Sequence, residues 1–126
     1  MNQPEKRAHI QINLGSIDGF PLVTLCGECD AFTAPFTHGA VGALIDAGYT
    51  GIIIDITDLR YMDGAGFEAL DSCCTKIKTV DGMLLIVNPG TNIENIYELL
   101  REKDSCEIER DVESALARLR NTQGRK

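Results

Sequence analysis

Asp63-Gly64-Ala65-Gly66 is the segment whose residue types best suit chemistry, because a carboxylate is followed by two glycines around an alanine. The apolar run 52–56 precedes it and an amphipathic pattern follows, which predicts a loop ending on a helix N-terminus. Free backbone N–H groups at such a terminus attract anions, and missing side chains allow close approach to the backbone. The segment therefore suits phosphate or a protein partner, while a simple helix cap would also explain Asp63.

Gly64, Gly66 and Ala69 also satisfy the loose glycine pattern of dinucleotide-binding turns. In a Rossmann fold, however, the turn follows its strand at once, whereas residues 57–63 intervene here. Asn88 stands roughly 20 residues on, where an acidic residue should hold the ribose. We therefore expect no bound nucleotide cofactor.

The five cysteines include a CxxC, Cys26 to Cys29, and an adjacent pair at 73–74. A redox CxxC would lie at a helix N-terminus that lowers the pKa of the first thiol, but Cys26 is expected on a strand and Cys29 on the turn after it. A zinc site would need two further ligands at a recognised spacing, which the sequence lacks. An odd count without a secretion signal argues against a disulfide framework. We expect reduced, structural or incidental thiols and no metal.

His9 and His38 are the two histidines that could act as a general base in a Ser-His-Asp or Cys-His arrangement. One lies near the N-terminus and the other within a predicted helix, away from the edge where a site is expected. The sequence therefore predicts that the protein is not an enzyme.

Composition excludes several classes of partner. The chain has 126 residues, the size of one ordinary domain, and a net charge of −7 from 12 basic and 19 acidic residues. Such a charge repels nucleic acid. No segment approaches the roughly 20 apolar residues of a membrane span, and no apolar signal core is present, so we expect a cytosolic protein. The predicted domain covers 8–120, with flexible tails at 1–7 and 121–126.

Hydrophobic periodicity predicts a single α/β domain with a mixed sheet of four to five strands and about four helices. An antiparallel hairpin comes first, and strands alternating with helices then imply parallel pairing through right-handed crossovers. A Thr33 hydroxyl cap is expected to start the first helix, and Asp63 the second. The expected segments are hairpin strands at 9–14 and 22–26, strands at 51–56, 83–87 and 106–108, and helices at 33–47, 63–77, 93–100 and from 111.

In such a sheet, the loops after the carboxyl ends of parallel strands gather on one edge, where ligands and partners bind. These loops are 28–33, 58–66 and 88–91. Asp30 should end the second strand, so we expect it beside Asp63. A turn carboxylate solvated by water is the alternative interpretation of Asp30.

The run from Gly51 to Leu70, GIIIDITDLRYMDGAGFEAL, resembles the core signature of STAS domains, the fold of the bacterial anti-sigma-factor antagonists. Upstream, Gly27-Glu28-Cys29-Asp30 stands where that family tends to carry Gly-Glu-Leu-Asp, and residues 82–87 fit its next strand. The order and spacing of these motifs, rather than any one of them, carry the resemblance.

The resemblance implies a non-catalytic module that binds an anti-sigma factor and so regulates transcription by partner switching. That partner is often also a kinase, so the ATP belongs to the partner. The family's partner surface falls on Asp30 and on Asp63, Gly64, Ala65 and Gly66.

One departure concerns regulation. In the phospho-regulated antagonists a Ser or Thr follows the Asp and is phosphorylated, whereas Gly64 and Ala65 offer no hydroxyl. Either binding is constitutive or regulation acts through another residue. The alternatives are a STAS subunit of a stress-signalling scaffold or transporter-associated complex, and a small-molecule or nucleotide-binding domain.

Overall fold

The computed structural model describes residues 9–88 and 107–123, which form one six-stranded sheet with three helices packed on it. The strands are β1 Ile10–Ile17, β2 Phe20–Cys29, β3 Gly51–Asp55, β4 Leu59–Met62, β5 Met83–Val87 and β6 Glu107–Glu109. The helices are α1 Ala34–Asp46, α2 Gly64–Lys78 and α4 Val112–Gln123. The predicted α/β class is confirmed, with one strand more than expected.

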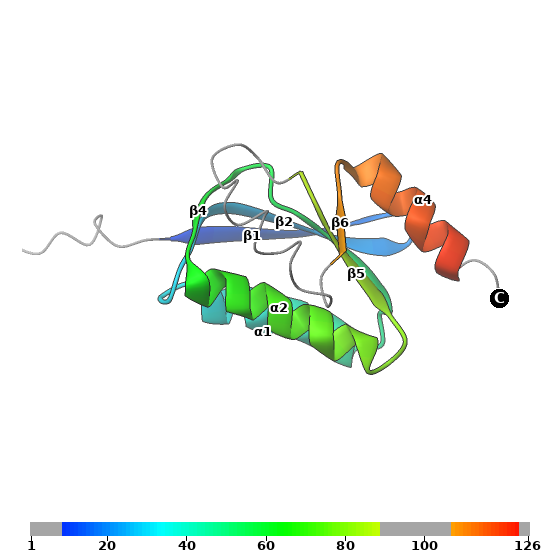
Figure 1. Ribbon diagram of the computed structural model, residues 1–126, viewed down its shortest axis with the longest axis horizontal. Helices are drawn as coiled ribbons and strands as arrows, with labels where there is room; N and C mark the ends of the chain where they lie inside the picture. Colours follow the sequence, from blue (N-terminus) through cyan, green and yellow to red (C-terminus); the bar gives the residue numbers. More distant parts are fainter. Residues whose placement is uncertain (1–8, 89–106, 124–126) are drawn as a thin grey trace, which may run out of the picture.

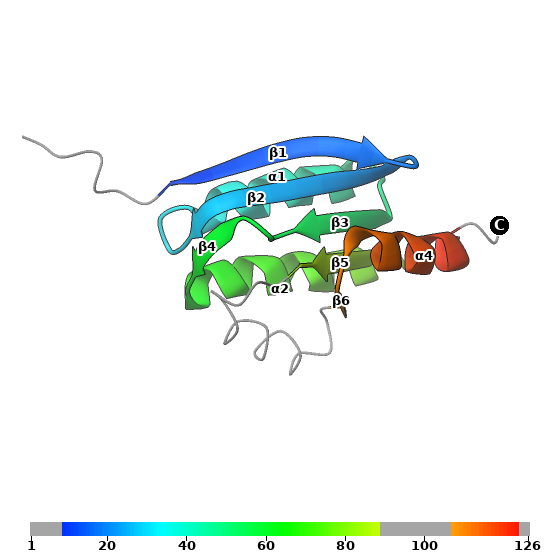
Figure 2. The same ribbon diagram turned by 90° about the horizontal axis from the view of Figure 1, so that it is seen from above.

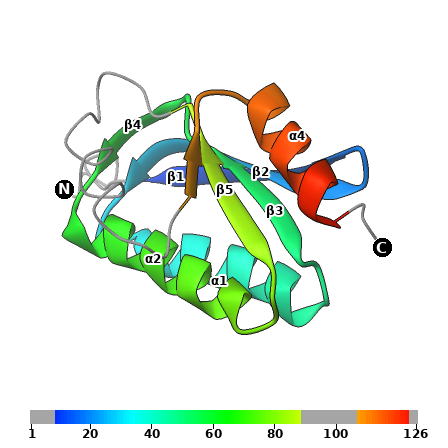
Figure 3. The same ribbon diagram turned by 45° about the vertical axis from the view of Figure 1, so that its right-hand side comes forward.

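The sheet is mixed in the predicted way. Its order is β1-β2-β3-β5-β6, and β4 pairs with β2 off this path. β1 and β2 form an antiparallel hairpin, whereas every other pair is parallel. α1 and α2 lie side by side on one face, and α4 lies on the other (Figure 1 and Figure 3). These crossovers place the start of both α1 and α2 at the same end of the sheet.

The core has two layers because β3 is covered on both faces. Ile52 and Ile54 pack in the larger cluster beneath α1 and α2, whereas Ile53 packs in the smaller cluster beneath α4. All three are fully buried, which explains the unbroken apolar run in the sequence. The predicted apolar faces of the helices also point inward, and their fully buried members include Val41, Leu70, Cys74, Ala115 and Leu119.

The hairpin turn is shorter than the sequence suggested. The first predicted strand of the hairpin ends at residue 14, but residues 15–17 continue β1, and Ile17 pairs with Phe20. Only Asp18 and Gly19 remain in the turn, with φ angles of 53° and 86°. Positive φ at both central residues gives a turn whose twist matches that of the two strands, and Asp-Gly favours it. The local turn preference of Gly15 and Ser16 is therefore overridden by strand pairing.

β4 corrects the prediction that residues 58–66 are a loop. β2 pairs with β3 only through Leu22 to Thr24 and then with β4 through Gly27 to Cys29. Figure 2 shows β4 continuing past β3 along β2. The register shifts after Gly27, which has a φ of +104°, and a Cβ added to it would lie only 2.5 Å from the His9 carbonyl oxygen. The change of strand partner thus requires glycine there.

The remaining predictions concern the C-terminal part. The edge strand expected at 106–108 is confirmed as β6, one residue later, parallel to β5. α4 begins one residue after Asp111, whose carboxylate accepts the Ser114 N–H, and continues to Gln123, past the predicted domain end at 120. The helix predicted at 93–100 and the tail at 1–7 lie outside the described residues.

Candidate functional site

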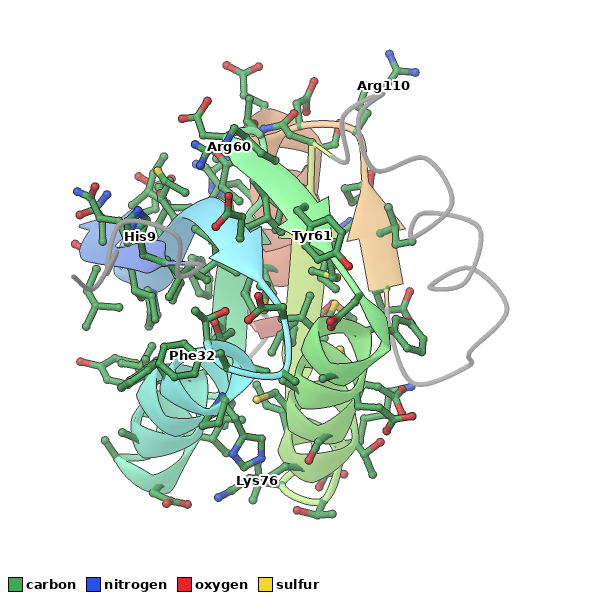
Figure 4. The ribbon with its side chains drawn as sticks, turned by 90° about the vertical axis from the view of Figure 1, so that its left-hand side faces the viewer. His9, Phe32, Arg60, Tyr61, Lys76 and Arg110 are labelled. Atoms are coloured by element: carbon green, nitrogen blue, oxygen red, sulfur yellow. The ribbon has the colours of Figure 1, made fainter. Side chains whose placement is uncertain are left out.

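The carboxyl ends of β2 and β4 bring Asp30 and Asp63 to one end of the molecule, as predicted. The Asp63 N–H donates to the Cys29 carbonyl oxygen at 3.2 Å and joins the two strand ends directly. Figure 4 faces this end, where α1 and α2 also begin. We call Asp30 together with residues 63–66 the β2–β4 end. Of the third predicted loop, residues 88–91, the structure describes only Asn88. Its side chain donates a hydrogen bond to Asp55, at the point where β5 and β3 end.

Asp63 caps α2, as the sequence predicted. Its Oδ1 accepts the backbone N–H groups of Ala65 at 3.0 Å and Gly66 at 3.1 Å. A carboxylate in this position also interacts favourably with the helix dipole. Because the chain's own carboxylate already occupies two of the free N–H groups, the start of α2 is less suited to an external anion than the sequence suggested.

The two glycines of this turn have different surroundings. A Cβ on Gly66 would lie 2.2 Å from the Cys29 carbonyl oxygen and 2.9 Å from Met62 Cγ, so the close backbone approach is to the chain itself. A Cβ on Gly64 would meet nothing within 4 Å, and Gly64 is exposed. Neither glycine has a positive φ. Gly66 is therefore required by packing, whereas Gly64 leaves an open surface position.

Asp30 organises the turn between β2 and α1. Its Oδ1 accepts the N–H groups of Phe32 at 2.9 Å and Thr33 at 3.0 Å. The Thr33 hydroxyl also lies 3.3 Å from this oxygen, so the bonds that the described residues make to the carboxylate all fall on Oδ1. This turn fixes the carboxylate beside the end of β4.

The predicted hydroxyl cap at Thr33 is wrong, although Thr33 is the N-cap residue and Pro35 lies in the first turn. The buried Thr33 hydroxyl donates instead to the Glu28 carbonyl oxygen at 2.7 Å and accepts the Asp30 N–H at 2.9 Å. A side chain that caps a helix usually belongs to a residue with extended φ and ψ, whereas Thr33 has helical values, and its hydroxyl bonds the end of β2 instead.

Cys29 is predicted on the turn after the strand, but it is the last residue of β2 and fully buried. Burial raises the pKa of its thiol, a contact with the Thr37 hydroxyl at 3.8 Å lowers it, and the Asp63 and Asp30 carboxylates raise it. Cys26 lies three residues earlier and so on the other face of the strand. Within the described ranges, no three His, Cys, Asp or Glu side chains are grouped to hold a metal ion.

Two exposed aromatic residues flank the β2–β4 end and were missed by the sequence analysis. Phe32 is 58% exposed and Tyr61 is 50% exposed, and both are labelled at this end in Figure 4. No ion pair found in the described part of the chain includes Asp30 or Asp63. The surface thus combines aromatic rings with two carboxylates that have no cationic partner there.

Comparison with known protein families shows to which family the chain belongs. A family model described as the STAS domain matches residues 11–115, from the second residue of β1 to the first turn of α4. The chain belongs to the STAS domain family.

Relatives of this STAS domain carry related descriptions. A protein described as a candidate anti-sigma factor antagonist, BtrV of Bordetella bronchiseptica, is 20% identical over 71% of this chain and 78% of its own length. The crystal structure of an anti-sigma factor antagonist from Mycobacterium paratuberculosis is 22% identical with a TM-score of 0.78, covering 89% of this chain and 95% of that one. The Bacillus cell fate determinant SpoIIAA in its phosphorylated form is 19% identical with a TM-score of 0.66, covering 87% and 100%. These structures share the fold.

Hydroxyl groups near the β2–β4 end are arranged as follows in this STAS domain. Thr33 and Thr37 are buried, whereas Ser72 on α2 is exposed, with its Oγ 3.2 Å from His38 Nε2 on α1. Ser72 lines a shallow groove of about 540 Å³ between the two helices that also includes Ala65. None of the helices in the described ranges combines the length and apolar character that crossing a membrane requires.

Proposed function

We propose that this STAS domain is a non-catalytic antagonist that binds a kinase-type anti-sigma factor in the cytoplasm and so regulates transcription. The partner surface is the β2–β4 end, with Asp30, Asp63, Gly64, Ala65 and Gly66. One observation carries the proposal: Gly64 is exposed and unobstructed beside the Asp63 cap, at the position where the family's phosphoacceptor would lie. The descriptions of the relatives support the choice of partner.

Gly64 also carries the regulatory part of the proposal. It has no hydroxyl, so a kinase partner has no acceptor at this position, and binding here is not switched off by phosphorylation. SpoIIAA, which shares the fold, exists in a phosphorylated form. The difference between the two proteins is therefore open to a direct test by restoring a hydroxyl.

The experiment uses a purified kinase-type anti-sigma factor from the same genome and isothermal titration calorimetry, with intact-mass analysis after incubation with MgATP. The wild-type protein should bind and keep both its mass and its affinity after MgATP. Gly64→Ser should gain one phosphoryl group and lose affinity. Phosphorylation of the wild-type protein at another residue, such as Ser72, coupled to release of the partner would contradict unswitched binding.

Gly64→Asp tests the surface without a kinase reaction. The new carboxylate has space around it and lies at a helix N-terminus, which tolerates acidic residues, so the melting temperature should stay unchanged. Its bulk and its charge next to Asp63 should weaken the partner complex about tenfold or more through steric clash and like-charge repulsion. Equal affinity of variant and wild type would show that the β2–β4 end is not the partner surface.

A further inference from the structure

A second apolar feature lies beside the β2–β4 end, on the β1 side of α1. It is a groove of about 370 Å³ between the start of β1 and the first turn of α1, which we call the phenylalanine groove. Its lining residues are His9, Ile10, Ile12, Phe32, Thr33 and Phe36. Phe32 belongs to the Asp30 turn itself, so the groove and the β2–β4 end form one continuous surface.

Large apolar side chains are exposed at this groove. Phe36 is 61% exposed and Phe32 is 58% exposed, whereas Ile10 and Ile12 are partly buried against the main core. Removing a phenylalanine ring from water is favourable because it buries a large apolar area. Two such rings, four residues apart at a helix start, favour a surface that is covered in a complex.

The charges beside the phenylalanine groove indicate the chemistry of the surface that binds there. Asp30 keeps one carboxylate oxygen outside its turn, and neither it nor Asp63 belongs to an ion pair in the described part of the chain. The complementary surface is therefore apolar with a flanking Arg or Lys. A second copy of this chain fits poorly, because it carries a net charge of −7 and would present the same two carboxylates.

We propose that the anti-sigma factor inserts an apolar side chain into the phenylalanine groove and sets a cationic side chain against Asp30. This inference rests on the proposed function and extends its surface across the first turn of α1. The groove supplies binding energy through desolvated aromatic contact, and the carboxylate orients the partner.

The test measures the affinity of the purified kinase-type anti-sigma factor for Phe36→Ser, Phe32→Ser and a matched control, Tyr49→Ser. Tyr49 is also an exposed aromatic residue, at 45%, but it follows the opposite end of α1. Each phenylalanine variant should bind about tenfold or more weakly with an unchanged melting temperature, and the control should bind within twofold of wild type. Asp30→Asn keeps an oxygen for the turn N–H groups, so it should mainly reduce the salt dependence of binding.

The outcomes separate the two proposals. Phenylalanine variants that bind as tightly as wild type would overturn the groove and leave the proposed function standing. A wild-type protein that does not bind the anti-sigma factor would overturn both. Sedimentation equilibrium gives an independent check: a concentration-dependent dimer that is lost in Phe36→Ser would overturn the assignment in favour of a second copy of this chain.

Discussion

Replacing Gly66 with alanine should destabilise the fold strongly, although alanine normally strengthens a helix. The new Cβ would lie 2.2 Å from the Cys29 carbonyl oxygen, about 1 Å inside ordinary contact. That oxygen also accepts the Asp63 N–H, so moving it weakens the bond between the ends of β2 and β4. Overpacking typically costs about 1–3 kcal/mol, and a weakened hydrogen bond adds about 1 kcal/mol.

We therefore expect Gly66→Ala to lower the free energy of unfolding by about 2–4 kcal/mol, measured by urea titration with circular dichroism. At roughly 3–5 °C per kcal/mol for a domain of this size, the melting temperature should fall by roughly 6–20 °C. Gly64→Ala is the matched control in the same turn. Its added Cβ would meet nothing within 4 Å, so this substitution should raise the free energy of unfolding by about 0.4–1 kcal/mol. Equal melting of Gly66→Ala and wild type would refute the close approach of α2 to β2.

Two further predictions concern the side chains behind the surface. Burial raises the Cys29 pKa above that of an ordinary thiol, so between the two values the folded chain holds a proton that the unfolded chain releases. The resulting stability is complete below about pH 9 and is lost as pH rises through the raised pKa. The test measures the free energy of unfolding by urea titration at several pH values for wild type, Cys29→Ala and the control Cys26→Ala. The loss of stability with rising pH should become smaller in Cys29→Ala alone. The same pH dependence in both variants would contradict the prediction. Thr33→Val should lower the free energy of unfolding by about 1–3 kcal/mol, because it removes the hydroxyl that bonds the Glu28 carbonyl oxygen and the Asp30 N–H. Thr33→Ser keeps a hydroxyl and should retain most of the stability. A valine variant as stable as wild type would contradict a stabilising role for these two hydrogen bonds.

Much of the fold was predictable because its signals are local and periodic. The apolar stripe of α2, the continuous run of β3 and the Asp63 cap each follow from neighbouring residues, and the structure confirms them. β4 was missed because its four residues show no alternation, the first and last being buried and the two between exposed, and because its pairing depends on β2 leaving β3 before Gly27. The extent of the hairpin turn likewise depends on strand register, which turn preferences do not specify.

At the site, the sequence placed Asp30 and Asp63 together but did not explain their environment. The reason for Gly66 is a contact with Cys29, 37 positions earlier in the chain, which no local pattern records. The Thr33 hydroxyl and the burial of Cys29 depend in the same way on where β2 ends relative to α1. The phenylalanine groove was also missed, because a helical pattern does not reveal which aromatic residues remain exposed once β1 is in place.

The length of β2 has a mechanical consequence for anything that binds at its end. β2 leaves β3 after Thr24, yet its pairing with β1 continues without a break from Phe20 to Gly27. Antiparallel hydrogen bonds lie perpendicular to the strands, so a force pulling on Asp30 along β2 loads many of them in shear at once. The Asp30 turn is therefore tethered to the whole hairpin rather than to its own few contacts, and a partner dissociating under tension should leave before the turn unravels.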